Sequence, residues 1–180
     1  GAAPGAPPGG GSTSVDTGTG AYTLSDGETL TGDTYTSTNA DENAIRAEGD
    51  ATATLENVTV EKTAGAASNN DASSFYGLNA AILALDNATP NITGGTVTAT
   101  AEGANGVFAY DGATINITDT TVNVSGGNAG GIEVAGGGTM HATNLTVNAT
   151  VKAAIRSDRG GGTMVVDGGT YTTSGHSGAP

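Results

Sequence analysis

The amino-acid sequence predicts an all-β protein, a right-handed parallel β-helix (β-solenoid) of about six rungs, where one rung is one full turn of the chain. A seven-residue phrase recurs along the sequence, as in residues 106–112 and 154–160. Its apolar anchors lie 25, 25 and 23 residues apart, at Ile82, Val107, Ile132 and Ile155. Aromatic residues make up only 4% of the chain, which also lacks Trp and contains 31 Gly. A repeat of this length is typical of a solenoid, and the Gly content suits many tight turns.

Each repeat is expected to contain three short strands. The recurring phrase forms the first strand, in which Ile45 and Ala47 alternate with polar residues and so point inward. A Gly- or Asp-rich turn follows, and then two Thr/Val-rich runs such as 114–117 and 120–122 supply the second and third strands. Pro90 is the one awkward inward residue, because proline removes a hydrogen-bond donor from a strand.

The chain is predicted to form one solenoid domain over residues 21–180, preceded by a Gly/Pro-rich arm or linker over residues 1–20. An insertion over about residues 63–77 interrupts the repeat and is expected to form a loop on one face. Neither end of the repeat region carries an obvious cap, which favours assembly through open rungs.

The charge balance limits the possible partners. The chain has a net charge of −13 and only five basic residues, which argues against binding nucleic acid or anionic membranes. No stretch is apolar enough for membrane insertion. The chain has no Cys, which excludes disulfides and thiolate metal sites. No calcium-binding nonapeptide repeat is present either, so the sequence predicts no metal and no cofactor.

Residues 106–118 and 153–171 resemble the rungs of secreted right-handed β-helix repeat proteins of bacteria. These are adhesin-like surface proteins whose rungs are similar to those of the pectate-lyase superfamily. The resemblance extends from about Tyr22 to the end of the chain. It implies a secreted or cell-surface location, but one fold serves many functions and the resemblance predicts no activity.

Two outward columns on the first strands contain an apolar block, consisting of Leu83, Leu85, Phe108 and Tyr110. Aliphatic and aromatic groups beside charged ones are typical of a sugar- or peptide-binding face. Alternatively, the 63–77 insertion folds over the block and buries it, which we favour because an exposed patch of this kind normally needs a cover.

Glu133, Arg156 and Asp158 occupy neighbouring positions in the same columns and complete the set of candidate ligand-binding residues. In the lyase superfamily acidic residues hold calcium, and an Arg or Lys removes a proton. Here the charges are of mixed sign, so a cross-rung ion pair between Glu133 and Arg156 is the simplest interpretation, and no catalytic residue is assigned.

Polar columns cover the second and third strands. One consists of Thr at 34, 59, 96, 121, 146 and 170, an array that resembles ice-binding solenoids, although Thr also simply suits β structure. Seven Asn-x-Ser/Thr triplets are possible N-glycosylation sites in a suitable host, and repeat composition alone also generates them. They begin at Asn57, Asn87, Asn91, Asn116, Asn123, Asn144 and Asn148.

The sequence therefore predicts a non-catalytic extracellular structural or adhesive protein whose expected partner is itself, through end-to-end assembly into a filament. One alternative is a module that binds carbohydrate, such as cell-surface glycans, or acts on polysaccharide. A second alternative is ice binding through the Thr columns.

Overall fold

The computed structural model describes residues 15–175 of the 180-residue chain. The predicted arm at residues 1–20 therefore lies mostly outside the described residues, and the first strand begins at Thr19. The first strands of the six rungs are β2 (Thr19–Thr23), β5 (Glu42–Ala47), β8 (Ile82–Ala84), β11 (Val107–Tyr110), β14 (Ile132–Ala135) and β16 (Ile155–Ser157).

The second and third strands complete each rung. In the first four rungs they are separate: β3 (Thr29–Thr31) and β4 (Thr34–Ser37), β6 (Thr52–Glu56) and β7 (Thr59–Lys62), β9 (Thr89–Thr93) and β10 (Thr96–Ala99), and β12 (Thr114–Thr118) and β13 (Thr121–Val124). In the last two rungs they merge into β15 (Gly138–Ala149) and β17 (Gly162–Thr173).

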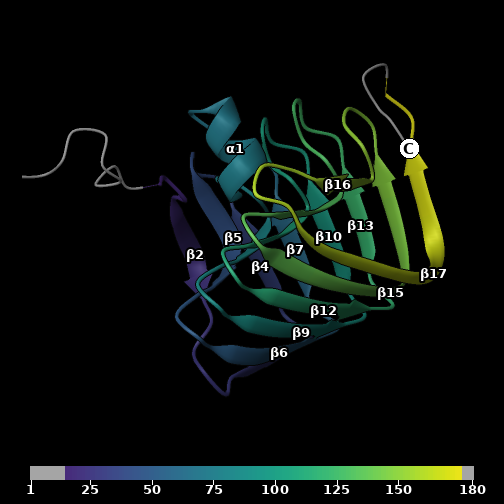
Figure 1. Cartoon of the computed structure of the whole chain (residues 1–180). Helices are drawn as coiled ribbons and strands as arrows, with labels where there is room; N and C mark the ends of the chain where they lie inside the picture. The colour runs from purple at the N-terminus through teal and green to yellow at the C-terminus, as the bar shows by residue number, and fades with distance from the viewer. Residues whose placement is uncertain (1–14, 176–180) are drawn as a thin grey trace, which may run out of the picture.

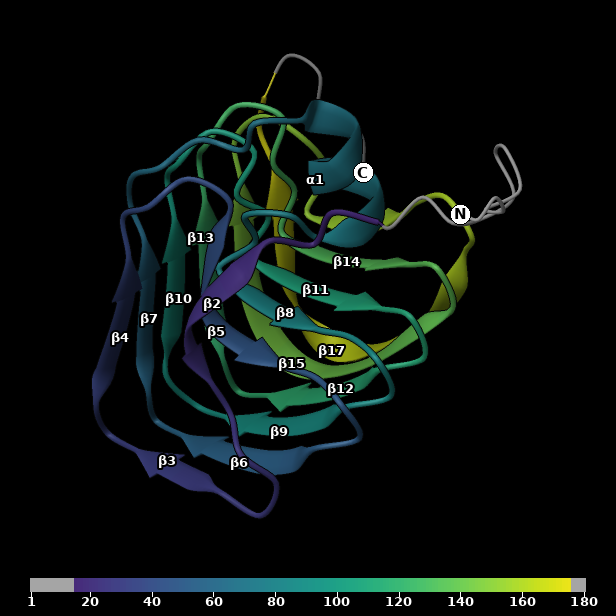
Figure 2. The ribbon, with the colours of Figure 1, turned by 90° about the vertical axis from the view of Figure 1, so that its left-hand side faces the viewer.

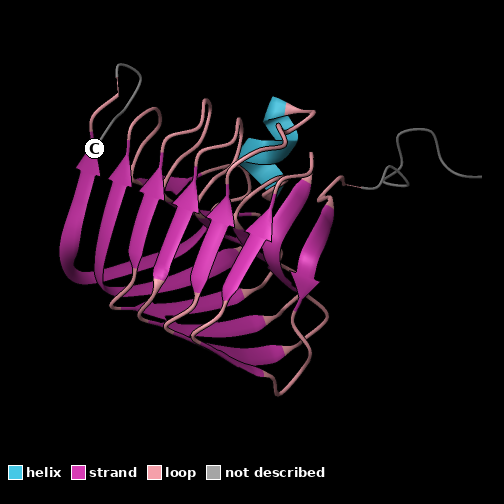
Figure 3. Cartoon of the chain, turned by 180° about the vertical axis from the view of Figure 1, so that it is seen from behind, coloured by secondary structure: helices cyan, strands magenta, loops and turns pink. Residues whose placement is uncertain are grey.

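Strands of the same kind stack in parallel and form the predicted parallel β-solenoid of six rungs (Figure 2). The first strands build a six-stranded sheet in the order β16-β14-β11-β8-β5-β2, and the others build a ten-stranded sheet. The pairing aligns the predicted inward column, from Ile45 through Ile82, Val107 and Ile132 to Ile155. Figure 3 shows the parallel strands of the stack side by side along the solenoid. Both sheets enclose one narrow apolar core of Ile, Val, Leu and Ala.

Turns between first and second strands use left-handed backbone. Asp111 and Gly112 have φ of 52° and 75°, as the Asp-Gly sequence predicts for a tight turn. Asp86 and Asn87 take the equivalent positions one rung earlier, with φ of 52° and 63°. Asn and Asp tolerate this conformation better than other non-Gly residues, which explains their frequency at these corners.

The insertion contains a helix, which was not predicted. Helix α1 (Asn70–Tyr76) begins where the Asn69 side chain accepts a hydrogen bond from the Ala72 N–H at 2.9 Å. It ends at Gly77, whose φ of 76° provides a left-handed C-cap. Figures 1 and 2 show α1 lying against the six-stranded sheet, on the outer side of the solenoid. Between residues 15 and 175, no helix has the length and apolar character needed to cross a bilayer.

Candidate functional site

Helix α1 covers the apolar block that the sequence analysis identified on the first strands. Leu83 and Phe108 are fully buried, Leu85 is 8% exposed and Tyr110 is partly buried. With Ala80 and Ala135 they form a second small core between the sheet and the helix. The predicted cover by the insertion is thus what the structure shows, and the alternative of an open binding face on these residues is wrong.

The end of α1 lies very close to this block because residue 77 is glycine. A Cβ atom at Gly77 would lie 2.5 Å from Leu83 Cδ1 and 3.1 Å from the Phe108 ring. Polar contacts also hold the helix. Ser73 Oγ donates to the Gly103 carbonyl at 2.7 Å, and Asn105 Nδ2 donates to the Ser73 carbonyl at 3.0 Å. The helix is therefore part of the folded unit and not a loose loop.

Glu133, Arg156 and Asp158 come together as predicted. Glu133 and Arg156 are register partners on β14 and β16. Arg156 Nη1 lies 3.6 Å from Glu133 Oε1, and Arg156 Nη2 donates to Asp158 Oδ2 at 3.0 Å. This arrangement is the cross-rung ion pair that the sequence analysis favoured.

Glu133 is fully buried, and neither of its carboxyl oxygens has a hydrogen-bond partner among the described residues. Burial raises its pKa well above the usual range, and the Asp158 carboxylate adds to this effect. The Arg156 guanidinium opposes it. Phe108 lies beside Glu133 in the same column, and Glu133 is closed off from solvent, whereas the Arg156 and Asp158 side chains remain 18% and 20% exposed.

A second buried charge was missed by the sequence analysis. Lys62 is fully buried at the inner corner of β7, and its Nζ donates to Ser37 Oγ at 3.1 Å and to the Asn39 carbonyl. Burial lowers its pKa, while Glu42 and Asp41 oppose that change. Lys62 follows Val58 and Val60 at every second position, so the alternation in the sequence indicated that its side chain points inward.

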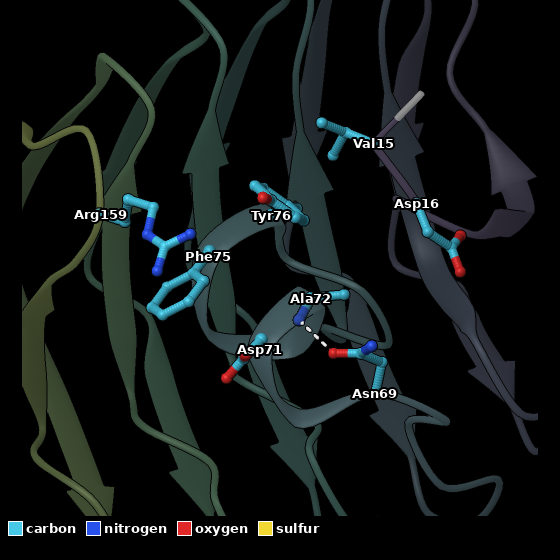
Figure 4. A pocket seen from close by; sticks show the side chains of 8 residues that line it. All are labelled: Val15, Asp16, Asn69, Asp71, Ala72, Phe75, Tyr76 and Arg159. Atoms are coloured by element: carbon cyan, nitrogen blue, oxygen red, sulfur yellow. Dashed lines mark hydrogen bonds between the residues drawn. The ribbon is translucent and has the colours of Figure 1, made fainter. Parts of the chain in front are cut away.

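A pocket of about 460 Å³ lies on the outer side of α1 (Figure 4). It brings together residues from the first rung, the helix and the last rung: Val15, Asp16, Asn69, Asp71, Ala72, Phe75, Tyr76 and Arg159. The Arg159 guanidinium stacks on the Phe75 ring at 4.1 Å, and the Tyr76 ring lies 5.6 Å from that of Tyr110. None of the predicted ligand-binding residues lines this pocket.

The polar columns are in the predicted register. Thr34, Thr59, Thr96, Thr121, Thr146 and Thr170 pair in succession along the whole stack. An amide pair lies beside this column, with Asn148 donating to Asn123 at 2.9 Å, and another lies on the second strands, with Asn116 donating to Asn91 at 2.8 Å. The side chains of Asn57, Asn87 and Asn144 are exposed, and those of the other four triplet asparagines are half-buried. Within the part of the chain described, no three His, Cys, Asp or Glu residues gather as a metal site would require.

The two end rungs place larger side chains in the inward columns. Tyr22 and Tyr35 contact each other in the first rung with ring centroids 5.1 Å apart, and the Tyr22 hydroxyl donates to Glu28. In the last rung Met164 and Tyr171 pack on the core. The neighbouring inward residue Val166 is 38% exposed.

Comparisons with protein-family models, with curated proteins and with solved structures find no match to this chain. The β-solenoid fold is shown by the structure itself, whereas no relative supports an adhesin-like or pectate-lyase-like identity.

Proposed function

We propose that this protein is a non-catalytic structural or adhesive β-solenoid of the cell exterior that assembles head to tail into filaments. The proposal rests on one observation, the unpaired strand edges at the two ends of the stack. At one end of the stack β2, β3 and β4, and at the other end β16 and β17, have an outer edge that pairs with no strand in residues 15–175 (Figure 1). Unpaired edges of this kind are templates for pairing with another chain.

The two ends match each other in strand order and in register. Each column of the stack begins in the first rung and ends in the last, so a second copy placed below would continue every column. The continued register brings Ile155 onto Tyr22 and Val166 onto Leu30. It also brings Tyr171 onto Tyr35. All pairs would be parallel, as they are inside the molecule.

The side chains at this joint favour association. Leu30 lies inward at one end, and the partly exposed Val166 and Met164 lie inward at the other. Tyr35 and Tyr171 would meet as an aromatic pair across the joint. Because the contact joins two different surfaces of the same chain, it does not close on itself and generates a filament.

A non-catalytic role is supported by the use of the candidate site residues in packing. Leu83 and Phe108 are fully buried beneath α1, and Glu133 is fully buried beside Phe108 in the same column. The cell exterior is supported by the resemblance of the rungs to secreted proteins and by the acidic, polar outer faces, which also suit repeated weak contacts to other surfaces.

Electron microscopy and sedimentation of the purified protein test the proposal. We expect filaments with a subunit repeat of about 29 Å, six rungs at the strand spacing of about 4.8 Å. Val166→Lys places a charge in the joint and should leave monomers. Val165→Lys is the matched control, since Val165 is the outward neighbour on β17 and is 50% exposed, so a lysine there extends into solvent and does not enter the core of the joint. Protein that stays monomeric at high concentration would overturn the proposal.

A second candidate function, ice binding, rests on the unbroken six-Thr column. Its regular hydroxyl spacing could order water, although Glu61 interrupts the adjacent column. Thermal hysteresis that Thr121→Tyr abolishes would support this function, and the absence of hysteresis in the unmodified protein would remove it.

A further inference from the structure

Charge is distributed unevenly between the two ends of the stack. The first rung, taken as residues 15–41, has five acidic side chains and no basic one: Asp16, Asp26, Glu28, Asp33 and Asp41. The last rung, taken as residues 151–175, has two acidic side chains, Asp158 and Asp167. It also holds three of the five basic residues of the whole chain: Lys152, Arg156 and Arg159.

We propose that this polarity is an electrostatic code for the head-to-tail joint, in which the basic last rung of one copy selects the acidic first rung of the next. The inference rests on the proposed function and specifies its partner surface. It also excludes head-to-head contacts, because two acidic first rungs would repel each other.

The continued register places specific opposite charges together. Arg159 lies four residues after Ile155, and Asp26 lies four residues after Tyr22, which is the position that Ile155 would cover. The two side chains are therefore in facing turns. Both are exposed, and neither forms an ion pair within residues 15–175. Within one copy the Arg159 guanidinium stacks on Phe75 of its own helix α1, and it turns away from that ring to meet the carboxylate of the next copy.

Lys152 supplies a second positive charge at the neighbouring corner. It lies three residues before Ile155, as Thr19 lies three residues before Tyr22, so it would face the segment of the next copy that contains Asp16. Arg156, by contrast, is already engaged with Glu133 and Asp158 and is not needed for the joint. The code thus depends on Lys152 and Arg159 on one surface and on Asp16 and Asp26 on the other.

Charge reversal tests the code more directly than salt, because salt also screens the mutual repulsion of copies that each carry a net charge of −13. The first-rung variant is Asp16→Lys with Asp26→Lys, and the last-rung variant is Lys152→Glu with Arg159→Glu. The control, Glu56→Lys with Glu102→Lys, changes exposed acidic residues of the second and third rungs. Circular dichroism and thermal melting establish that each variant is folded.

We expect each end variant alone to stay monomeric and an equimolar mixture to form filaments of alternating copies, while the control assembles unaided. Two outcomes overturn the code: end variants that assemble alone as readily as the unmodified protein, or a mixture that stays monomeric. Failure of the unmodified protein to assemble would instead refute the proposed function.

Should a reversal variant not fold, the milder Asp26→Asn and Arg159→Gln replacements decide the matter. Each should raise the critical concentration about two- to five-fold, the range expected for one rim ion pair. An unchanged critical concentration in both would also overturn the code.

Discussion

Replacing Phe108 with Ala tests the burial of the apolar block beneath α1, the cover that the sequence favoured. Phe108 is fully buried between Leu83 and Glu133 in its column, with the end of α1 at Gly77 against its ring. Removing a fully buried Phe costs about 3–5 kcal/mol through lost burial and the cavity left behind. Had the ring stood on an open face, its removal would change stability by only about 0.5 kcal/mol.

Thermal and denaturant unfolding measure this difference. For a chain of this size, about 2–4 °C of melting temperature is lost per kcal/mol, so Phe108→Ala should lower the midpoint by roughly 10 °C. Val165→Ala, at a half-exposed position on β17, is the control and should leave the midpoint nearly unchanged. Limited proteolysis should also cut the 63–77 segment faster in Phe108→Ala. A loss below about 1 kcal/mol, with unchanged proteolysis, would refute the packing described for α1.

Two further replacements test the helix and the buried acid. Gly77→Ala should lower the free energy of unfolding by about 1–2 kcal/mol because of the left-handed backbone alone, and by more because the added methyl group clashes with Leu83. Gly137 has a φ of 84° and open space around it, so Gly137→Ala should cost only the backbone part. Equal losses of unfolding free energy in the two variants would refute the close approach of Gly77 to Leu83. Glu133 has a raised pKa, so its contribution to stability falls as pH rises from its ordinary pKa of 4.5 toward the raised value. Glu133→Gln should therefore match the unmodified protein near pH 4 and exceed it in unfolding free energy at pH 8; the reverse order would contradict the burial of this acid.

The repeat in the sequence was enough to predict the stack. The spacing of Ile82, Val107 and Ile132 placed them in one column, and the pairing confirms that alignment. Register could be predicted because a slip of one residue would turn every inward Ile and Val outward. Asp111 likewise indicated its turn, since few residues tolerate left-handed backbone there.

The sequence predicted that the 63–77 insertion covers the apolar block, but it did not predict that the insertion forms a helix. Residues 63–77 lie outside the repeat, so no column gave their positions. Helix α1 is only seven residues long, too short to be stable by itself. It forms because Asn69 and Gly77 cap it and because Leu83 and Phe108 offer an apolar surface. Those contacts are tertiary, and the pocket on its outer side depends on them as well.

The buried charges have a physical role in fixing the end rungs. A slip of two residues keeps the inward pattern of a strand and so is poorly resisted by apolar packing alone. Lys62 lies one rung from the first end and donates to Ser37 in the first rung. Glu133 lies one rung from the other end, where Arg156 of the last rung approaches it. A two-residue slip of either end rung would separate these partners and leave a buried charge unpaired, which costs several kcal/mol. Among residues 15–175 each end rung packs on a neighbouring rung from one side only. Polar contacts therefore fix the register of the end rungs, which two flanking rungs fix elsewhere. A joint between copies depends on that register being unique.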